Sequence, residues 1–235
     1  MRALTVLFAA TLLAGCGSAP TAPPPEGAPG ATAARERPSR GTALDALEQL
    51  AVKGRAPKTG YDREQFGGDW ASVDGCDTRE RILERDLRRI AREPGGDCEV
   101  QSGVLADPYT ASAIRFERGG ASEVDIDHVV ALGDAWQTGA QQWSFERRVR
   151  FANDPLNLLA VDASANRQKG DSDAASWLPP NKAFRCAYVA RQIAVKGRYR
   201  GWVTPAEHDA MQRVLARCPR TRLPLRSARS PAPSS

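Results

Sequence analysis

Two short apolar runs constrain the fold of this 235-residue chain more than any other feature. In the first, residues 123–130, Val124 and Ile126 alternate with acidic residues, which is the period-two pattern of a half-buried strand. The second run, residues 156–161, is apolar except for one asparagine. Between them, residues 133–153 carry aromatic side chains mostly at helical spacings. The sequence therefore predicts two strands joined by an inserted helical segment.

Helix and turn signals lie on both sides of these runs. Thr42 and Asp77 precede helical patterns, the second of which extends to Ile90. Residues 204–207 form a capping box with proline at the first helical position. An upstream hairpin is expected around the turn Asp107–Thr110. Because we find no internal repeat, a single α+β domain with an upstream hairpin and flanking helices is the predicted fold class.

The two ends of the chain do not resemble a folded core. Residues 1–16 have a basic start, a short apolar run and small residues before Cys16, which indicates an export signal and resembles a bacterial lipobox. Cys16 would then become the lipidated N-terminus, anchored at the outer face of the cell membrane. An ordinary signal peptide, and hence a secreted protein, is the alternative. Residues 17–41 predict a Pro/Ala-rich tether, residues 42–221 the folded domain and residues 222–235 a disordered tail.

Four cysteines remain once Cys16 is set aside. An even number of cysteines in an exported protein predicts two disulfides, for which three pairings are possible. We expect the sequence-local pairing, Cys76 with Cys98 and Cys186 with Cys218. A zinc site is the alternative, but no two of these cysteines have the close spacing that structural zinc usually uses.

The charge of the chain fits a polyanionic partner without requiring one. Its formal net charge is +5 and its isoelectric point is near 9.1. An acidic envelope surface would attract the same charge, so the charge alone does not distinguish between these partners.

Polar residues in and after the two runs form the candidate site. Asp127 precedes His128, whose unperturbed pKa leaves the ring largely neutral near physiological pH, as a general base requires. Strict alternation sends these two side chains to opposite faces, so we expect the regular strand to break at about Asp127 if both serve one site. Asn157 and Asn166 also have ordinary interpretations, an amide paired with nearby backbone and a helix N-cap respectively.

Taken together, these residues resemble the HNH branch of the ββα-metal (His-Me finger) endonucleases. In that family, Asp-His closes the first strand, an Asn or His lies in the second strand, and an Asn or His lies on the following helix. Asp127-His128, Asn157 and Asn166 stand in those places, and Lys169 matches a basic residue that is common in the last element.

The resemblance has a specific core, residues 123–182, and covers most of the chain beyond the tether. It is closest to a subgroup found in exported bacterial proteins, and a similar module forms the C-terminal nuclease part of modification-dependent restriction enzymes. The stretches that carry it are Asn153–Leu158, Asn166–Asp171 and Trp177–Pro180, with Tyr61–Trp70, Gly75–Thr78 and Asp107–Thr110 upstream.

This resemblance implies metal-assisted hydrolysis of phosphodiester bonds in nucleic acid. His128 would be the general base, Asn157 would orient it, and Asp127 with Asn166 would hold one divalent cation. Because asparagine stands at both downstream places, a hard, oxygen-ligated ion such as Mg²⁺ is expected, although Mn²⁺ and Ca²⁺ accept the same ligands.

The resemblance also implies the partners. Arg167 and Lys169 would hold flanking phosphates of the substrate, which we expect to be DNA rather than RNA. Arg147, Arg148 and Lys182 are further candidates for this role, although each could equally be solvated surface charge. No obligate protein partner is expected, and membrane contact would be made through the N-terminal lipid. The alternatives are a catalytically inactive envelope lipoprotein that binds nucleic acid or another polyanion, and a different phosphodiesterase or a nuclease toxin.

Overall fold

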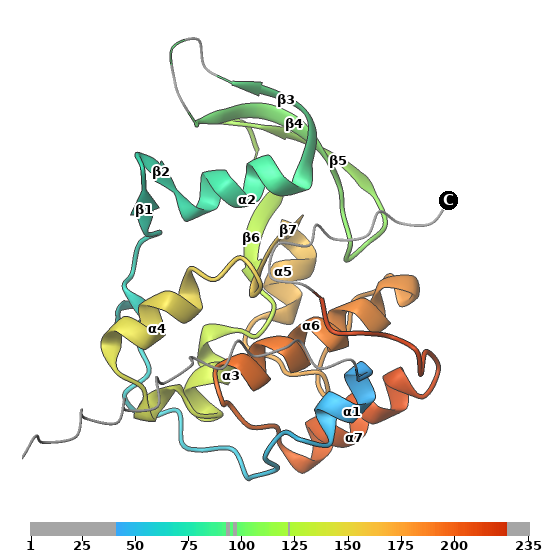
Figure 1. Cartoon of the computed structure of the whole chain (residues 1–235). Coiled ribbons are helices and arrows are strands. Elements are labelled where there is room, and N and C mark those ends of the chain that lie inside the picture. Colours follow the sequence, from blue (N-terminus) through green and yellow to red (C-terminus); the bar gives the residue numbers. More distant parts are fainter. Residues whose placement is uncertain (1–40, 93–94, 96–97, 122, 225–235) are drawn as a thin grey trace, which may run out of the picture. The chain divides into compact units, whose positions relative to one another are not determined.

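A ββα unit lies at the centre of the fold (Figure 1). Strand β6 (Val124–His128) pairs antiparallel with β7 (Leu158–Asp162), and helix α5 (Ala163–Lys169) follows β7 directly. Both strands predicted from the apolar runs are thus confirmed, within two residues at each end. The computed structural model describes residues 41–92, 95, 98–121 and 123–224.

The segment between the two strands is helical, as expected. It consists of α3 (Leu132–Gln137), the short 3-10 helix η2 (Ala140–Gln142) and α4 (Phe145–Ala152). Two of its aromatic side chains, Trp136 and Phe151, pack against Phe66 of η1 (Arg63–Phe66), with a centroid distance of 6.0 Å between Phe66 and Phe151. This packing fixes η1 against α4 and so places the loop after η1 beside the end of α4.

A second, three-stranded antiparallel sheet packs on the ββα unit through α2 (Thr78–Asp86). Its strands β3 (Leu87–Arg92), β4 (Val100–Ala106) and β5 (Ala113–Glu117) lie in the order β3-β4-β5. The hairpin predicted around Asp107–Thr110 is therefore confirmed as β4 and β5. In Figure 1, α2 lies between this sheet and the β6–β7 pair.

The predicted length of α2 was wrong. The helix ends at Asp86 instead of Ile90, and Leu87 adopts an extended backbone with ψ of 157°. Leu87 pairs with Leu105 of β4, and the register then shifts around Arg89, whose φ is +51°. The spacing of Leu87 and Ile90 fits either a helix or a strand. Pairing with β4, which is distant in sequence, makes this segment a strand.

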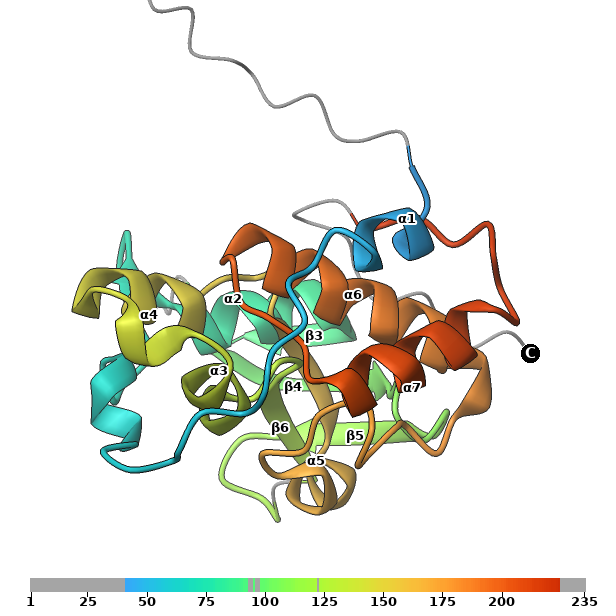
Figure 2. The ribbon, with the colours of Figure 1, turned by 90° about the horizontal axis from the view of Figure 1, so that it is seen from below.

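The C-terminal region is helical and packs against the first helix of the domain. Helices α6 (Arg185–Arg198) and α7 (Pro205–Leu215) both contact α1 (Ala43–Leu47), which Figure 2 shows beside them. Capping boxes begin α1 at Thr42 and α7 at Thr204. Each box satisfies backbone N–H groups that the first turn of a helix cannot pair.

Two short elements precede α6 and α2. The 3-10 helix η3 (Lys182–Phe184) is capped by Asn181 and leads into α6. Strands β1 (Ser72–Val73) and β2 (Cys76–Asp77) form a small hairpin, and Asp77 then caps α2 as predicted.

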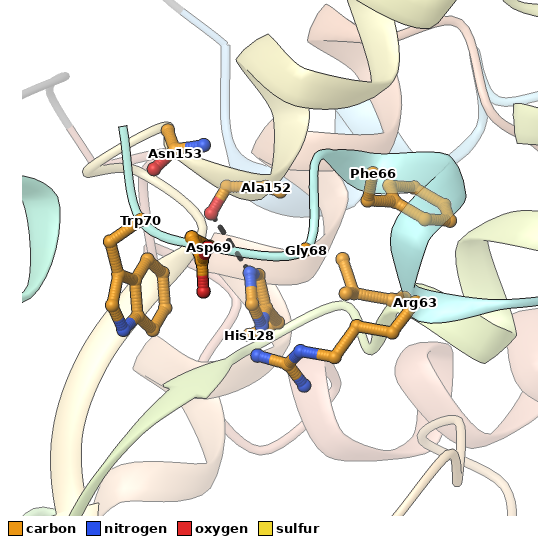
Figure 3. A pocket seen from close by; sticks show the side chains of 9 residues that line it. Arg63, Phe66, Gly68, Asp69, Trp70, His128, Ala152 and Asn153 are labelled. Carbon is orange, nitrogen blue, oxygen red and sulfur yellow. Dashed lines mark hydrogen bonds between the residues drawn. The ribbon is translucent and has the colours of Figure 1, made fainter. Parts of the chain in front are cut away.

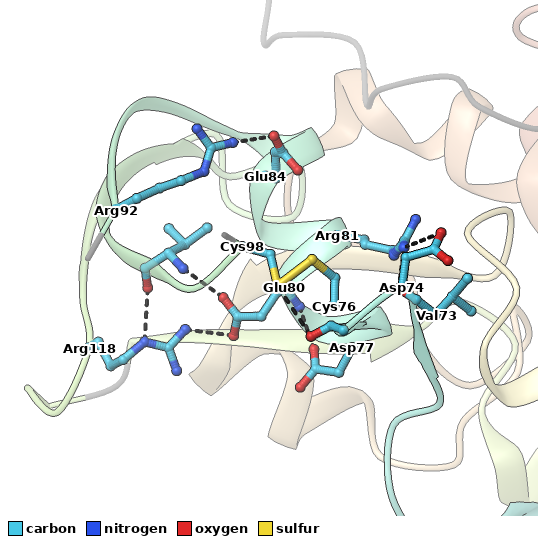
Figure 4. The surroundings of a disulfide bond; sticks show 12 residues. Val73, Asp74, Cys76, Asp77, Glu80, Arg81, Glu84, Arg92, Cys98 and Arg118 are labelled. Carbon is cyan, nitrogen blue, oxygen red and sulfur yellow. Dashed lines mark hydrogen bonds and ion pairs between the residues drawn. A yellow bond between two sulfur atoms is a disulfide. The ribbon is translucent and has the colours of Figure 1, made fainter. Parts of the chain in front are cut away.

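Two disulfides tie these elements together. Cys76 is bonded to Cys98, with Cα atoms 5.7 Å apart, and Cys186 to Cys218, with Cα atoms 6.5 Å apart. Figure 4 shows the first bond above Glu80, whose carboxylate accepts hydrogen bonds from the Val100 amide and from the Arg118 guanidinium. The sequence-local pairing is the one that the structure contains.

All described residues belong to one compact unit, Arg40–Ser235. The predicted export signal with Cys16, nearly all of the tether and most of the tail lie outside the described residues. Within the described part of the chain, no helix is both long enough and apolar enough to cross a membrane.

Candidate active site

Asp127 lies in a buried contact between three elements. Its side chain is 5% exposed, and its Oδ1 accepts a 2.8 Å hydrogen bond from Nζ of Lys169 in α5. Its Oδ2 accepts a hydrogen bond from the hydroxyl of Tyr109, in the turn between β4 and β5. Burial and the charge of Asp127 raise the pKa of Tyr109 well above its usual value, so the phenol stays protonated and donates. The carboxylate is therefore held by two donors, one from a segment before Asp127 in the chain and one from a segment after it.

Lys169 was expected to contact a substrate phosphate, but it is buried inside the protein. Its side chain is fully buried, and Nζ also donates a 2.8 Å hydrogen bond to the carbonyl of His128. A buried ammonium needs a partner of opposite charge, and the Asp127 carboxylate on the neighbouring strand β6 is that partner. In this structure the predicted contact between Lys169 and a flanking phosphate is replaced by an internal ion pair.

Asn166 faces β6 from the middle of α5. Its Nδ2 donates a 3.2 Å hydrogen bond to Oδ2 of Asp125. The N-cap of α5 is Asp162, which accepts from the Ala165 amide, so the N-cap interpretation of Asn166 is wrong. Asp125 and Asp127 are two residues apart on one strand and share a face. Three oxygen-bearing side chains therefore gather on the α5 side of β6.

His128 contacts a different set of residues. Its ring is stacked on the indole of Trp70, with centroids 5.5 Å apart and planes 16° apart. Its Nε2 lies 2.8 Å from the carbonyl oxygen of Ala152, at the end of α4. A carbonyl only accepts, so the ring donates Nε2–H, and Nδ1 is left as the proton acceptor.

The surroundings of His128 favour its neutral form. Burial lowers the pKa of the ring from 6.5 to about 4, although the hydrogen bond to Ala152 and the charge of Asp127 act in the opposite direction. The ring therefore carries an available lone pair at physiological pH, which is what a general base requires.

The break in β6 that we expected at Asp127 is absent. Regular pairing continues through His128, which lies opposite Leu158 of β7. The side chains of Asp127 and His128 consequently point to opposite faces, and the structure does not bring them into contact. They are linked instead through Lys169, whose ammonium bonds both the Asp127 carboxylate and the His128 carbonyl.

Asn157 holds the backbone that follows His128. Its side chain is fully buried, with Oδ1 accepting from the Val130 amide at 2.9 Å and Nδ2 donating to the Val130 carbonyl at 3.2 Å. The amide thus takes the place of a strand partner where the β6–β7 pairing ends. This is the ordinary pairing with nearby backbone, and it fixes the chain two residues after His128 without touching the imidazole.

The His128 ring borders a small cavity, which we call the His128 cavity (Figure 3). Its volume of about 10 Å³ is close to the space that one water molecule requires. The amide of Ala71 bonds the Asn153 side chain at 2.8 Å and thereby holds the loop over the cavity. The polar and aromatic residues that line it are Arg63, Phe66, Asp69, Trp70, His128 and Asn153.

Sequence reasoning missed three residues of this site. Tyr109 lies in the turn between β4 and β5, Arg63 on η1 and Trp70 in the loop after η1, all distant from His128 in sequence. The only indication was that the stretches Tyr61–Trp70 and Asp107–Thr110 took part in the family resemblance.

Two arginines proposed for phosphate binding have structural contacts instead. Arg147 donates to the carbonyl of Tyr199 at 2.7 Å, and Arg148 donates to the carbonyl of Gln65 at 2.8 Å. Arg167, by contrast, is exposed on α5, as is Lys182 on η3. The two exposed cations are thus the members of the predicted set that a phosphate can reach.

A separate acidic cluster lies among α3, α6 and α7. One oxygen from each of Asp134, Asp173 and Glu207 lies within 4.8 Å of the others. Lys196 bonds Asp134 at 3.0 Å and Glu207 at 2.7 Å, and Arg55 bonds Asp173. Side-chain cations therefore already compensate most of this charge. Burial raises the pKa of Glu207 to about 7, against the attraction of Lys196.

The described residues form a single α+β domain. A family profile for the C-terminal domain of GmrSD restriction endonucleases matches residues 77–214. The match covers more than half of the chain, so the chain belongs to this family.

A curated relative extends over nearly the whole chain. An uncharacterized secreted protein of Arthroderma benhamiae is 38% identical over 218 residues, which are 92% of this chain and 98% of the relative. The secreted relative and the two disulfides support export of this protein. No solved structure matches the chain.

Proposed function

We propose that this protein is an exported, metal-dependent endonuclease of the HNH type that hydrolyses nucleic-acid phosphodiester bonds. The observation that carries the proposal is the state of the His128 ring. Its Nε2–H is committed to the Ala152 carbonyl, and Nδ1 is left to accept a proton beside a cavity for about one water molecule. Membership of a restriction-endonuclease domain family supports nucleic acid as the substrate class.

The base step follows from these contacts. Nδ1 of His128 would accept a proton from a water molecule in the His128 cavity while the water oxygen bonds to phosphorus. The bond from phosphorus to the in-line leaving oxygen breaks, and that oxygen departs with the electron pair and takes a proton from solvent. The imidazolium that forms keeps its Nε2–H bond to the carbonyl of Ala152. A hydrogen bond from a charged donor is stronger than one from a neutral donor, so this carbonyl stabilises the product of the proton transfer.

Two residues hold His128 for this step. Lys169 joins the Asp127 carboxylate to the His128 carbonyl, and Asn157 fixes the backbone at Val130. Because they act on the strand on either side of the ring, loss of either contact would misplace the imidazole without removing it. A positioning error of this kind lowers the rate while the base itself is still present.

The oxygen-bearing side chains beside α5 fit a hard divalent cation. Carboxylate and amide oxygens are the ligands that Mg²⁺ and Mn²⁺ prefer, and a carboxylate oxygen that accepts one hydrogen bond keeps a second lone pair. Asp127 and Asn166 would hold the ion, with Asp125 as a further ligand. Because Asp127 and His128 point to opposite faces of β6, the substrate would have to reach both faces where the strand ends at His128, and the bound cation would then offset negative charge on the phosphate and on the leaving oxygen.

The place and substrate of the reaction are part of the same proposal. We assign the lipidation site to Cys16, so that the domain acts at the outer face of the membrane, and DNA is proposed as the substrate over RNA. Arg167 and Lys182, both exposed, are proposed to contact flanking phosphates. No protein partner is required for these steps.

A second candidate is a catalytically inactive protein of the same fold that binds nucleic acid or another polyanion. One observation favours it: both carboxylate oxygens of Asp127 are bonded within the protein, to Lys169 and Tyr109. An inactive relative would be expected to keep such a closed contact.

One panel of assays separates these two functions. The purified protein is incubated with single- and double-stranded DNA and RNA, each with Mg²⁺, Mn²⁺, Ca²⁺, Zn²⁺ or a chelator. A nuclease cleaves at least one of these substrates with a divalent ion and none with the chelator. Binding of DNA without cleavage under any condition would contradict the nuclease proposal and favour the inactive candidate.

A further inference from the structure

We propose that Arg63, on η1, binds the phosphate that is attacked by a water molecule held in the His128 cavity. This inference rests on the proposed nuclease function and adds to it a residue that contacts the reacting group. Neither the sequence motif nor the family match assigns a role to this arginine.

Arg63 is exposed and available for a ligand. Its side chain makes no hydrogen bond or ion pair with any residue that the structure describes. Arg147 and Arg148, on the neighbouring helix α4, are both bonded to backbone carbonyls. Asp69 lies on the rim of the same cavity, yet Arg63 does not pair with it. An unpaired cation beside a catalytic cavity fits an anionic ligand better than a structural role.

The side chain points toward the proposed base. Arg63 and His128 both line the His128 cavity, and Figure 3 shows the guanidinium directed toward the imidazole from the η1 side. A phosphate positioned beside this cavity would therefore lie next to the guanidinium.

The backbone that carries Arg63 is held in place. Phe66, one turn later, is 1% exposed and packs on Phe151. The Gln65 carbonyl accepts from Arg148, and the Asp62 side chain caps η1. The guanidinium thus projects from a fixed base, which limits the entropy lost when it binds a ligand.

The chemistry of the ligand follows from the guanidinium. Its planar N–H groups match two oxygens of one phosphate, and its charge offsets the extra negative charge that develops as water attacks. Arg63 should therefore act on the reacting phosphate, unlike a surface cation that holds a flanking phosphate.

The test is single-turnover cleavage of duplex DNA at saturating enzyme, with the Kd measured separately. The proteins are wild type, Arg63→Gln, Arg63→Lys and Arg88→Ala. Arg88 is an exposed arginine on β3 without an ion pair to any described residue, so it controls for the loss of one surface charge. Melting temperatures establish that each variant is folded.

We expect Arg63→Gln to lower the saturated rate by about 10²–10³-fold, as loss of one transition-state donor does. Arg63→Lys should recover part of this loss, and Arg88→Ala should cleave like wild type. An unchanged saturated rate in Arg63→Gln would overturn the inference, even if its Kd rises, because Arg63 would then hold only a flanking phosphate. If wild type itself does not cleave, the nuclease proposal fails, and that result is distinguishable from failure at Arg63 alone.

Discussion

Replacement of Lys169 by methionine should destabilise the protein strongly. Methionine keeps a similar length and volume but removes the charge. The substitution therefore leaves the carboxylate of Asp127 buried with only the Tyr109 hydroxyl as a partner. It also removes the donor of the 2.8 Å hydrogen bond to the His128 carbonyl.

The size of the effect follows from the burial of the pair. The side chains of Lys169 and Asp127 are 0% and 5% exposed, so water cannot replace the lost partner. Breaking a buried ion pair by removing one member costs about 3–5 kcal/mol. For a domain of this size, 1 kcal/mol corresponds to about 2–4 °C, so the melting temperature should fall by roughly 6–20 °C.

Thermal and urea unfolding of Lys169→Met and of Arg167→Met measure this effect. Arg167 is on the same helix but exposed, so its replacement should shift the melting temperature by less than about 2 °C. The reasoning would be refuted if Lys169→Met melted like wild type and lost only salt-dependent affinity for DNA. That result would mean that Lys169 faces a phosphate, as the sequence alone suggested.

Three further predictions concern other parts of the protein. Asn157→Ala leaves the buried N–H and C=O of Val130 without their partners; urea unfolding should show a loss of about 2–6 kcal/mol, and an unchanged midpoint would contradict the contact. The pKa of Glu207 is raised from 4.5 to about 7, so its contribution to stability is full below pH 4.5 and is lost as the pH rises through 7. Melting temperatures between pH 5 and 8 should therefore fall for wild type and stay flatter for Glu207→Gln; parallel curves would argue against this assignment. Chelation should abolish cleavage while the circular dichroism spectrum is retained, whereas unfolding on chelation would indicate a structural ion.

The parts of the fold that the sequence predicted are those set by local patterns. The alternation of Val124 and Ile126 and the capping box at Thr204 act within a few residues, and both elements were found where expected. The end of α2 was missed because Leu87 pairs with a strand that lies beyond an intervening loop. Local propensity cannot include such a partner.

The candidate site was predicted in composition but not in arrangement. The motif identified His128 and Asp127, and strand alternation correctly warned that they point to opposite faces. Whether Lys169 is buried or exposed depends on how closely α5 packs on β6, and the spacing of residues along the chain does not reveal this. Arg63 was missed because only packing of η1 on α4 brings it to the His128 cavity.

Single-turnover cleavage by His128→Ala, compared with wild type and with His208→Ala, tests the central claim most directly. The chain has two histidines, so His208 on α7 is a matched control outside the site. Metal affinity is measured separately by calorimetry for each protein. We predict that His128→Ala loses about 10²–10⁴-fold in rate while its metal affinity is nearly unchanged, and that His208→Ala cleaves like wild type. Cleavage by His128→Ala at the wild-type rate would contradict the assignment of the general base and the nuclease mechanism built on it.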